Sequence, residues 1–131
     1  MVIDTSALIA ILFDEPEAAR LIRAIAAAPV AIVGAPTLVE TGAVMLAKKG
    51  GSGGVALDAL IQRLGITIEP MSYEAAEFAR SAYGRYGKGV GSPGVLNYGD
   101  CLSSGVAQAL GEPLLFKGDD FSRTDVLRAE Y

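Results

Sequence analysis

The stretch MVIDTSALIAIL (residues 1–12) decides the fold, because it places an aspartate inside a run of apolar residues. Residues 1–4 predict a short buried strand, and Thr5 or Ser6 is the expected N-cap of the helix that follows. A charged carboxylate in a buried segment is costly unless it is paired, binds a metal or lies at an edge. Asp4 is partly redundant as a helix cap, because two hydroxyl residues follow it, and its position therefore indicates a second role.

The rest of the chain continues to alternate short apolar strands with helices. Such alternation is typical of a parallel sheet covered by helices on both faces. A glycine-rich GGSGG segment (residues 50–54) is expected to form a flexible turn. The sequence thus predicts one α/β domain over residues 1–131, without an internal repeat. Further strands are expected at residues 30–33, 66–69 and 114–116, and further helices at 14–28, 36–49, 54–64, 72–85 and 97–111. The pattern leaves open whether the polar tail adds a fifth strand.

The composition excludes several kinds of chemistry. The chain has 131 residues, of which 51% are hydrophobic and 20% charged, and this composition is typical of an ordered globular domain. It has no histidine, which rules out Ser–His and Cys–His catalysis and histidine-bound zinc. The single cysteine, Cys101, cannot form an internal disulfide and fits a reducing cytoplasm. No apolar run reaches about 18 residues, so no membrane-spanning helix is expected.

Acidic residues from four separate segments lie next to apolar residues, after predicted strands, in the first turn of a predicted helix or beside the apolar stripe of one. Each has an ordinary explanation on its own, as a helix cap, an exposed helix edge, a capping box or a solvated turn. The residues are Asp4 after the first strand, Glu40 on or beside the apolar stripe of its helix, Asp100 in the first turn of its helix, and Asp119 and Asp120 after the last strand.

A parallel sheet would bring these carboxylates to one edge, because ligands of open α/β sheets bind beyond the carboxyl ends of the strands. Several converging carboxylates cannot all stay ionised without a countercharge, and Mg²⁺ or Mn²⁺ is the expected one. Such a site activates water and neutralises charge at a phosphodiester, with one or two ions. The net charge of −4 argues weakly against nucleic-acid binding, but less so if the ions neutralise several acids.

The order of these motifs resembles the PIN-domain ribonucleases, and most closely the VapC toxins of VapBC toxin–antitoxin modules. The resemblance covers nearly the whole chain and is carried by IDTSALIAIL, PTLVETGAVM, LNYGDCLSSGVAQALGEPLLFKGDDF and a final TD. It implies a three-layer α/β/α sandwich with a parallel sheet of four or five strands. It also implies metal-dependent endonucleolytic cleavage of RNA, often transfer RNA, inhibition by a cognate VapB antitoxin, and a homodimer.

The resemblance also implies roles for residues of this chain. Asp4, Glu40 and Asp100 match the first three acids of the family and would bind Mg²⁺ or Mn²⁺, directly or through water. Ser6 would support the site through a hydrogen bond. The implied reaction is in-line attack on phosphorus by water whose pKa the metal has lowered.

The fourth acid of the family has two candidates in this chain. The family often carries an acid two or more residues before its DF pair, where this chain has Gly118. Either Asp119 or Asp120 would take the role, and the spacing does not settle which.

The glycine-rich stretch GRYGKGVGSPG (residues 84–94) carries basic and aromatic residues on a predicted loop. We expect Arg85, Tyr86 and Lys88 to contact RNA through phosphate pairing and base stacking. A linker without a binding role is the equally weighted alternative. Lys117, beside the last acids, is expected to hold phosphate or to pair with an acid.

Two other readings of the motifs stay open. A receiver-type signalling domain also combines parallel strands with a carboxylate Mg²⁺ site. It would need an acceptor aspartate after its middle strand, where this chain has Glu69, and paired acids after the first strand. A PIN-fold interaction module without catalysis is the other alternative, and the presence of every motif acid argues against it. The large hydrophobic fraction of the chain favours an interface with a partner protein.

Overall fold

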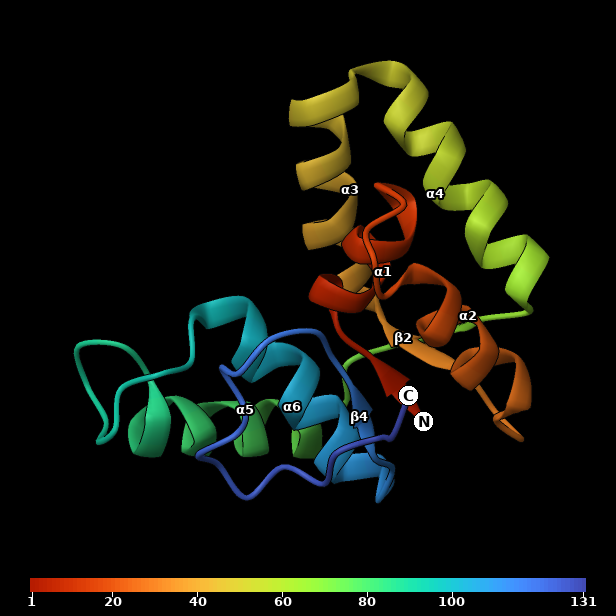
Figure 1. Cartoon of the computed structure of the whole chain (residues 1–131). Helices are drawn as coiled ribbons and strands as arrows, with labels where there is room; N and C mark the ends of the chain where they lie inside the picture. The colour runs from red at the N-terminus through yellow and green to blue at the C-terminus, as the bar shows by residue number, and fades with distance from the viewer.

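The computed structural model describes all residues 1–131 and contains a sheet of four parallel strands in the order β3-β2-β1-β4 (Figure 1). In the register of the sheet, Val2 pairs with Ile32 on one side and with Leu114 on the other. The predicted parallel sheet is confirmed. The tail adds only an isolated bridge between Leu114 and Arg128, rather than a fifth strand. The strands are β1 (Val2–Ile3), β2 (Ile32–Gly34), β3 (Thr67–Glu69) and β4 (Leu114–Leu115).

Six helices cover the two faces of this sheet, which confirms the expected three-layer α/β/α architecture (Figure 1). Successive strand residues point to opposite faces and into two separate cores. Ile3 joins the core under α1, α2 and α4, whereas Val2 joins the core under α5 and α6. The helices are α1 (Thr5–Leu12), α2 (Ala18–Ala27), α3 (Ala35–Lys49), α4 (Gly51–Leu64), α5 (Tyr73–Tyr86) and α6 (Tyr98–Leu110).

The expected N-cap of the first helix is wrong. Asp4 itself caps α1, because its side chain accepts a hydrogen bond from the backbone N–H of Ser6, and the helix begins at Thr5. The hydroxyls of Thr5 and Ser6 are free for other partners as a result. Asp4 thus caps the helix and also belongs to the acidic cluster, two roles that the sequence analysis gave to different residues. A carboxylate with two oxygens can cap a helix and still accept other hydrogen bonds.

The expected flexible turn at residues 50–54 is also wrong. Only Gly50 breaks the chain, with a positive φ of 64°, and α4 begins directly at Gly51. Gly53 allows this close turn, because a Cβ there would overlap the backbone of Met45 in α3. Tertiary contact between α3 and α4 therefore overrides the low helix propensity of glycine.

The strand order separates this fold from a receiver domain. The flavodoxin-like sheet of receivers has the order 2-1-3-4-5, in which the first and third strands are neighbours. Here β1 pairs with β2 and β4, and β3 lies at the edge beside β2. The receiver alternative is excluded by this topology. No helix of the structure has the length and apolar character needed to cross a membrane.

Candidate active site

Asp4 lies at the carboxyl end of the central strand β1 and is almost fully buried, with 2% of its surface exposed. Its backbone N–H donates to the carbonyl of Leu115, which ties it to β4. The hydroxyl of Ser6 donates to Asp4 Oδ2 at 2.6 Å and accepts from the backbone N–H of Lys117 at 3.0 Å. The hydroxyl of Ser103 donates to Asp4 Oδ1 at 2.6 Å. Ser6 and Ser103 thus hold the carboxylate directly, and the segment from Leu115 to Lys117 holds it indirectly.

Glu40 reaches the same edge of the sheet from α3. The hydroxyl of Thr5 donates to Glu40 Oε2 at 2.9 Å, and the residue is half-buried. Its carboxylate packs against Gly99 in the first turn of α6, where a Cβ would overlap it. Burial raises the pKa of Glu40, the Thr5 hydroxyl opposes this rise, and the negative charge of Asp4 adds to it.

Asp100 lies in the first turn of α6 and forms the predicted capping box with Asn97. Asp100 Oδ2 accepts from the backbone N–H of Asn97 at 2.7 Å, and Asn97 Oδ1 accepts from the backbone N–H of Asp100 at 2.8 Å. Burial raises the pKa of Asp100 to about 7, although the Asn97 N–H favours the charged form. The charges of Asp4, Asp120 and Glu40 contribute to the same rise.

Asp120 is the last acid whose charge acts on this site. It is exposed on the loop after β4. The charge of Asp120 raises the pKa of Asp100 more than the charge of Glu40 does. The backbone carbonyl of its neighbour Asp119 accepts two hydrogen bonds from Ser122, which closes the turn. The two candidates for the fourth acid therefore differ in surroundings, and Asp120 is the one that the electrostatics connect to the site.

No cation of the protein neutralises these carboxylates. None of Asp4, Glu40, Asp100 and Asp120 takes part in an ion pair. As they are placed, no three His, Cys, Asp or Glu side chains lie close enough to enclose an ion. The donor set is nevertheless of the right chemistry for a hard divalent cation, because carboxylate oxygens and water are its preferred ligands. The structural observation that fits such a cation is that Asp100 and Glu40, whose pKa values are raised first by burial and then by neighbouring carboxylates, have no cationic partner.

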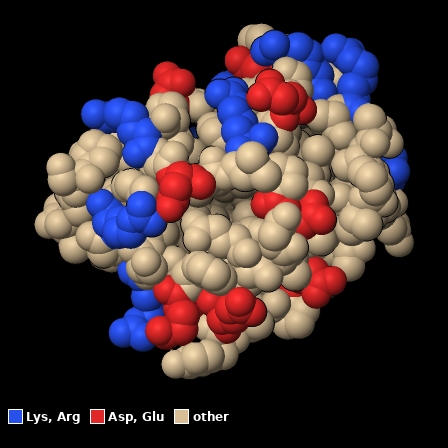
Figure 2. Space-filling model, turned by 90° about the horizontal axis from the view of Figure 1, so that it is seen from below, with Lys and Arg blue, Asp and Glu red and all other residues tan.

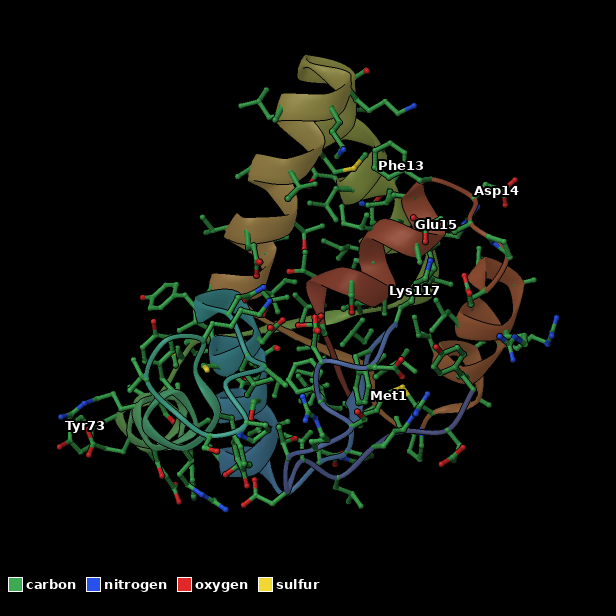
Figure 3. All side chains as sticks on the ribbon, turned by 60° about the vertical axis from the view of Figure 1, so that its left-hand side comes forward. Met1, Phe13, Asp14, Glu15, Tyr73 and Lys117 are labelled. Carbon is green, nitrogen blue, oxygen red and sulfur yellow. The ribbon has the colours of Figure 1, made fainter.

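The basic residues near the site are largely engaged with other acids. Lys117 pairs with Glu15 (Figure 3) and also with Glu17, and the hydrogen bond to Glu15 raises the pKa of Lys117. Lys117 therefore pairs with an acid, one of its two expected roles, and ties the loop after β4 to the turn before α2.

The stretch at residues 84–94, expected to be a loop, is a loop only from Gly87 onward. Arg85 and Tyr86 form the last turn of α5, because Tyr86 packs against the core under α5 and α6. The basic residues of this stretch are arranged in a similar way. Arg85 pairs with Asp125 at 2.6 Å and stacks over the ring of Tyr86, whereas Lys88 is exposed and has no ion-pair partner. Acidic and basic side chains also intersperse on the face shown in Figure 2, without a continuous basic patch.

Sequence reasoning missed two residues of the site, Ser103 and Gly99. Ser103 is fully buried, and its only sequence signal is a hydroxyl inside the apolar run of α6, one turn after Asp100. Gly99 gives no signal by itself, because its role depends on the approach of Glu40 from α3. Both roles arise from tertiary contacts, which residue spacing along the chain does not reveal.

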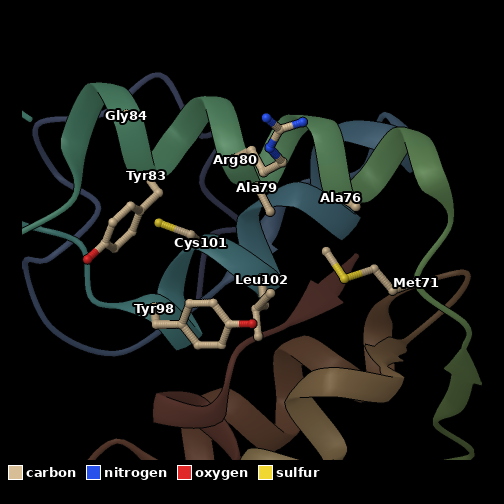
Figure 4. Close-up of a pocket in the computed structure, with 9 residues that line it drawn as sticks. All are labelled: Met71, Ala76, Ala79, Arg80, Tyr83, Gly84, Tyr98, Cys101 and Leu102. Atoms are coloured by element: carbon tan, nitrogen blue, oxygen red, sulfur yellow. The ribbon is translucent and has the colours of Figure 1, made fainter. Parts of the chain in front are cut away.

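An apolar groove runs between α5 and α6 next to the site. It has a volume of about 620 Å³, and Tyr83, Tyr98, Cys101 and Met71 point into it (Figure 4). A second hollow of about 550 Å³ shares Tyr98 with this groove and reaches Glu40. Burial raises the pKa of Cys101 to about 11, so its thiol stays protonated near neutral pH and is a poor nucleophile.

Comparisons with known proteins identify the family to which this chain belongs. The family model of the PIN domain matches residues 1–127. The chain is 45% identical over 126 residues to Ribonuclease VapC30 of Mycobacterium tuberculosis, which covers 96% of this chain and 95% of the relative. The chain therefore belongs to the VapC ribonuclease family of PIN domains.

Solved structures agree with the fold. The crystal structure of Mycobacterium tuberculosis VapC20, described as a Sarcin-Ricin loop cleaving toxin, aligns with a TM-score of 0.76 at 20% identity and covers 99% of this chain and 98% of the other. VapBC2 from Rickettsia felis, bound to a DNA fragment from its promoter, aligns with a TM-score of 0.75 at 17% identity over 98% of this chain and 96% of the other.

Proposed function

We propose that this protein is a metal-dependent endoribonuclease toxin that a VapB-type antitoxin inhibits. The observation that carries the proposal is the set of carboxylates at the carboxyl edge of the sheet, which come from β1, α3, α6 and the loop after β4 and lack any cationic partner. Family membership supports the same activity, because the VapC relatives are ribonucleases by name.

Asp4, Glu40, Asp100 and Asp120 are the residues that would hold Mg²⁺ or Mn²⁺. The bound cation would act as a Lewis acid that lowers the pKa of water and neutralises charge on the phosphodiester. The carboxylate of Asp100 has to give up the proton that it partly holds near neutral pH, so cation binding and loss of that proton are linked. Asp4 and Ser6 provide the fixed part of the site, because Asp4 is buried and held by hydrogen bonds.

RNA contacts are proposed for the basic residues of the rim. Lys88 is exposed on the glycine-rich loop without an ion-pair partner, which favours phosphate binding. Base stacking on Tyr86, at the end of α5, would require Arg85 to leave its ring. Arg85 and Lys117 would have to exchange their present partners, Asp125 and Glu15, for phosphate oxygens. Of the three basic side chains, we therefore propose Lys88 as the one that contacts RNA without giving up an ion pair.

The groove between α5 and α6 supports the proposed homodimer. Tyr98 is 73% exposed at the start of α6, and Val39 is 71% exposed on α3 across the adjoining hollow. Exposed apolar residues around a groove are typical of protein interfaces. We also propose a VapB-type antitoxin as partner and a cytoplasmic location, where RNA is available and the free Cys101 stays reduced.

The proposal is tested by expressing the protein briefly and mapping new 5′ ends in total RNA. Wild-type protein should produce one dominant set of cuts, and the isosteric variant Asp4→Asn should produce none at the same protein level. Co-expression of the cognate antitoxin should suppress the cuts. An identical pattern of 5′ ends in wild type, Asp4→Asn and the empty vector would contradict the proposed activity and leave the non-catalytic interaction module as the better description.

A further inference from the structure

Ser103 has one hydrogen to donate and two acceptors within reach. Its hydroxyl lies 2.6 Å from Asp4 Oδ1 and 3.1 Å from the backbone carbonyl of Asp100. A serine inside a helix commonly donates to a carbonyl one turn earlier, and the second contact is of this kind. The shorter distance and the negative charge of the acceptor favour Asp4, because hydrogen bonds to charged groups are shorter and stronger.

The hydrogen bonds of Asp4 occupy most of its acceptor capacity. An ionised carboxylate has about four lone-pair positions, two on each oxygen. Oδ2 accepts from both the backbone N–H and the hydroxyl of Ser6, which fills it. Oδ1 accepts only from Ser103, so one position remains open on that oxygen. Oδ1 is therefore the only oxygen of Asp4 through which a cation can bind without breaking a hydrogen bond.

We infer that Ser103 is a positioning residue that orients Asp4 so that it binds the divalent cation through Oδ1 alone. The inference rests on the proposed function and specifies how this chain builds the site. Ser103 is fully buried in α6, one turn after Asp100, so the same helix carries one acid of the site and orients another. Loss of the hydroxyl leaves Oδ1 without a donor, so that only the two hydrogen bonds to Oδ2 still restrain the carboxylate.

The matched control is Ser104, the next residue of α6. Ser104 is also fully buried, but its hydroxyl accepts from Gln108 Nε2 at 3.1 Å and touches no acid of the site. The variants Ser103→Ala and Ser104→Ala remove the same atom from adjacent buried positions. A general effect of losing a buried hydroxyl would therefore appear in both variants.

The test measures Mn²⁺ binding to the purified protein by electron paramagnetic resonance, together with RNA cleavage kinetics. Ser103→Ala should raise the Kd for Mn²⁺ about 10- to 100-fold, which is the usual effect of removing a residue that orients a metal ligand. It should also lower kcat at fixed Mn²⁺ with little change in KM for RNA. Ser104→Ala should stay within about threefold of wild type in all three quantities. Ser103→Thr, which keeps the hydroxyl, should restore Mn²⁺ affinity when it folds.

Each result decides the inference. Equal Mn²⁺ affinities of Ser103→Ala and Ser104→Ala would overturn it, whether or not Ser103→Thr folds, and so would a folded Ser103→Thr variant as weak as Ser103→Ala. In both cases wild-type binding and cleavage would leave the proposed function standing. A wild-type protein that binds no Mn²⁺ would overturn the proposed metal chemistry and this inference together.

Discussion

Asp100 shows how the surroundings of one residue can prepare a site for a cation. Its carboxylate is buried at a helix N-terminus, which favours negative charge, and yet its pKa rises to about 7. Burial and three neighbouring carboxylates outweigh the capping hydrogen bond. The protein keeps an acid that is only partly charged near neutral pH, and a divalent cation would reverse this balance.

The stability of the cation-free protein should reflect this pKa. Well below its ordinary pKa of 3.8, Asp100 is protonated in both the folded and the unfolded state, whereas between 3.8 and about 7 mainly the unfolded chain releases the proton. The free energy of unfolding therefore falls over this window and the loss persists above it. Asp100→Asn lacks this loss and should be more stable than wild type by about 1 to 3 kcal/mol near pH 8. Urea unfolding in EDTA near pH 5 and pH 8 measures the free energy of unfolding of wild type and of Asp100→Asn. A difference between the two proteins that is the same at both pH values would contradict the account.

Gly99 is a second residue whose effect is local. A Cβ at this position would overlap the carboxylate of Glu40, and Glu40 can swing away because its side chain is flexible. We expect Gly99→Ala to fold normally and to reduce RNA cleavage about 10-fold or more, as typical for a displaced metal ligand. Gly84→Ala, a helical glycine of α5 with open space around it, is the control. Circular dichroism and cleavage rates compare the two, and equal rates would show that Glu40 needs no such space.

At the scale of elements, the sequence predicted best where local chemistry decides. The helices expected at residues 72–85 and 97–111 form as α5 and α6, and Ser72 and Asn97 cap them, because their side chains and the backbone N–H groups they accept from are local. The start of α4 was predicted wrongly, because four glycines and a serine have low helix propensity. Contact with Met45 across the α3–α4 corner selects the helix there, and no local pattern reports that contact.

The α3–α4 corner gives a direct test of this explanation. Gly54→Ala adds a methyl group where nothing lies within 4 Å and should stabilise the protein by up to about 1 kcal/mol through helix propensity. Gly53→Ala adds the same group against the backbone of Met45 and should destabilise the protein. Thermal unfolding of the two variants in parallel checks the opposite signs. A similar gain in both would mean that the corner is not closely packed.

At the scale of the whole molecule, the parallel topology explains how distant residues form one site. Asp4 and Asp100 lie at the ends of β1 and α6, and Glu40 projects from α3 toward both. Asp4 and Asp100 were proposed from the sequence because one follows a strand and the other opens a helix, and Glu40 because it lies on or beside the apolar stripe of its helix. The spacing does not choose between Asp119 and Asp120, because the direction of a turn depends on contacts outside it, and Asp120 is our proposal.

The assembly of the protein is also tested at this scale. Tyr98→Glu places a charge in the proposed dimer groove, while an acid in the first turn is favourable for α6 itself. We expect this variant to elute as a monomer, whereas Val55→Glu, equally exposed at 69% on α4, should stay dimeric. Light scattering after gel filtration measures the masses. Dimers in both variants would move the interface away from the groove.

The most direct test of the central claim is cleavage of RNA by purified protein as Mn²⁺ or Mg²⁺ is added and then removed. The account predicts cuts that need the cation, stop in excess EDTA, return when the cation is restored, and fall at least about 100-fold in Asp4→Asn at equal thermal stability. Cleavage that persists in EDTA, or at full rate in Asp4→Asn, would contradict the assignment of these carboxylates as the catalytic metal site.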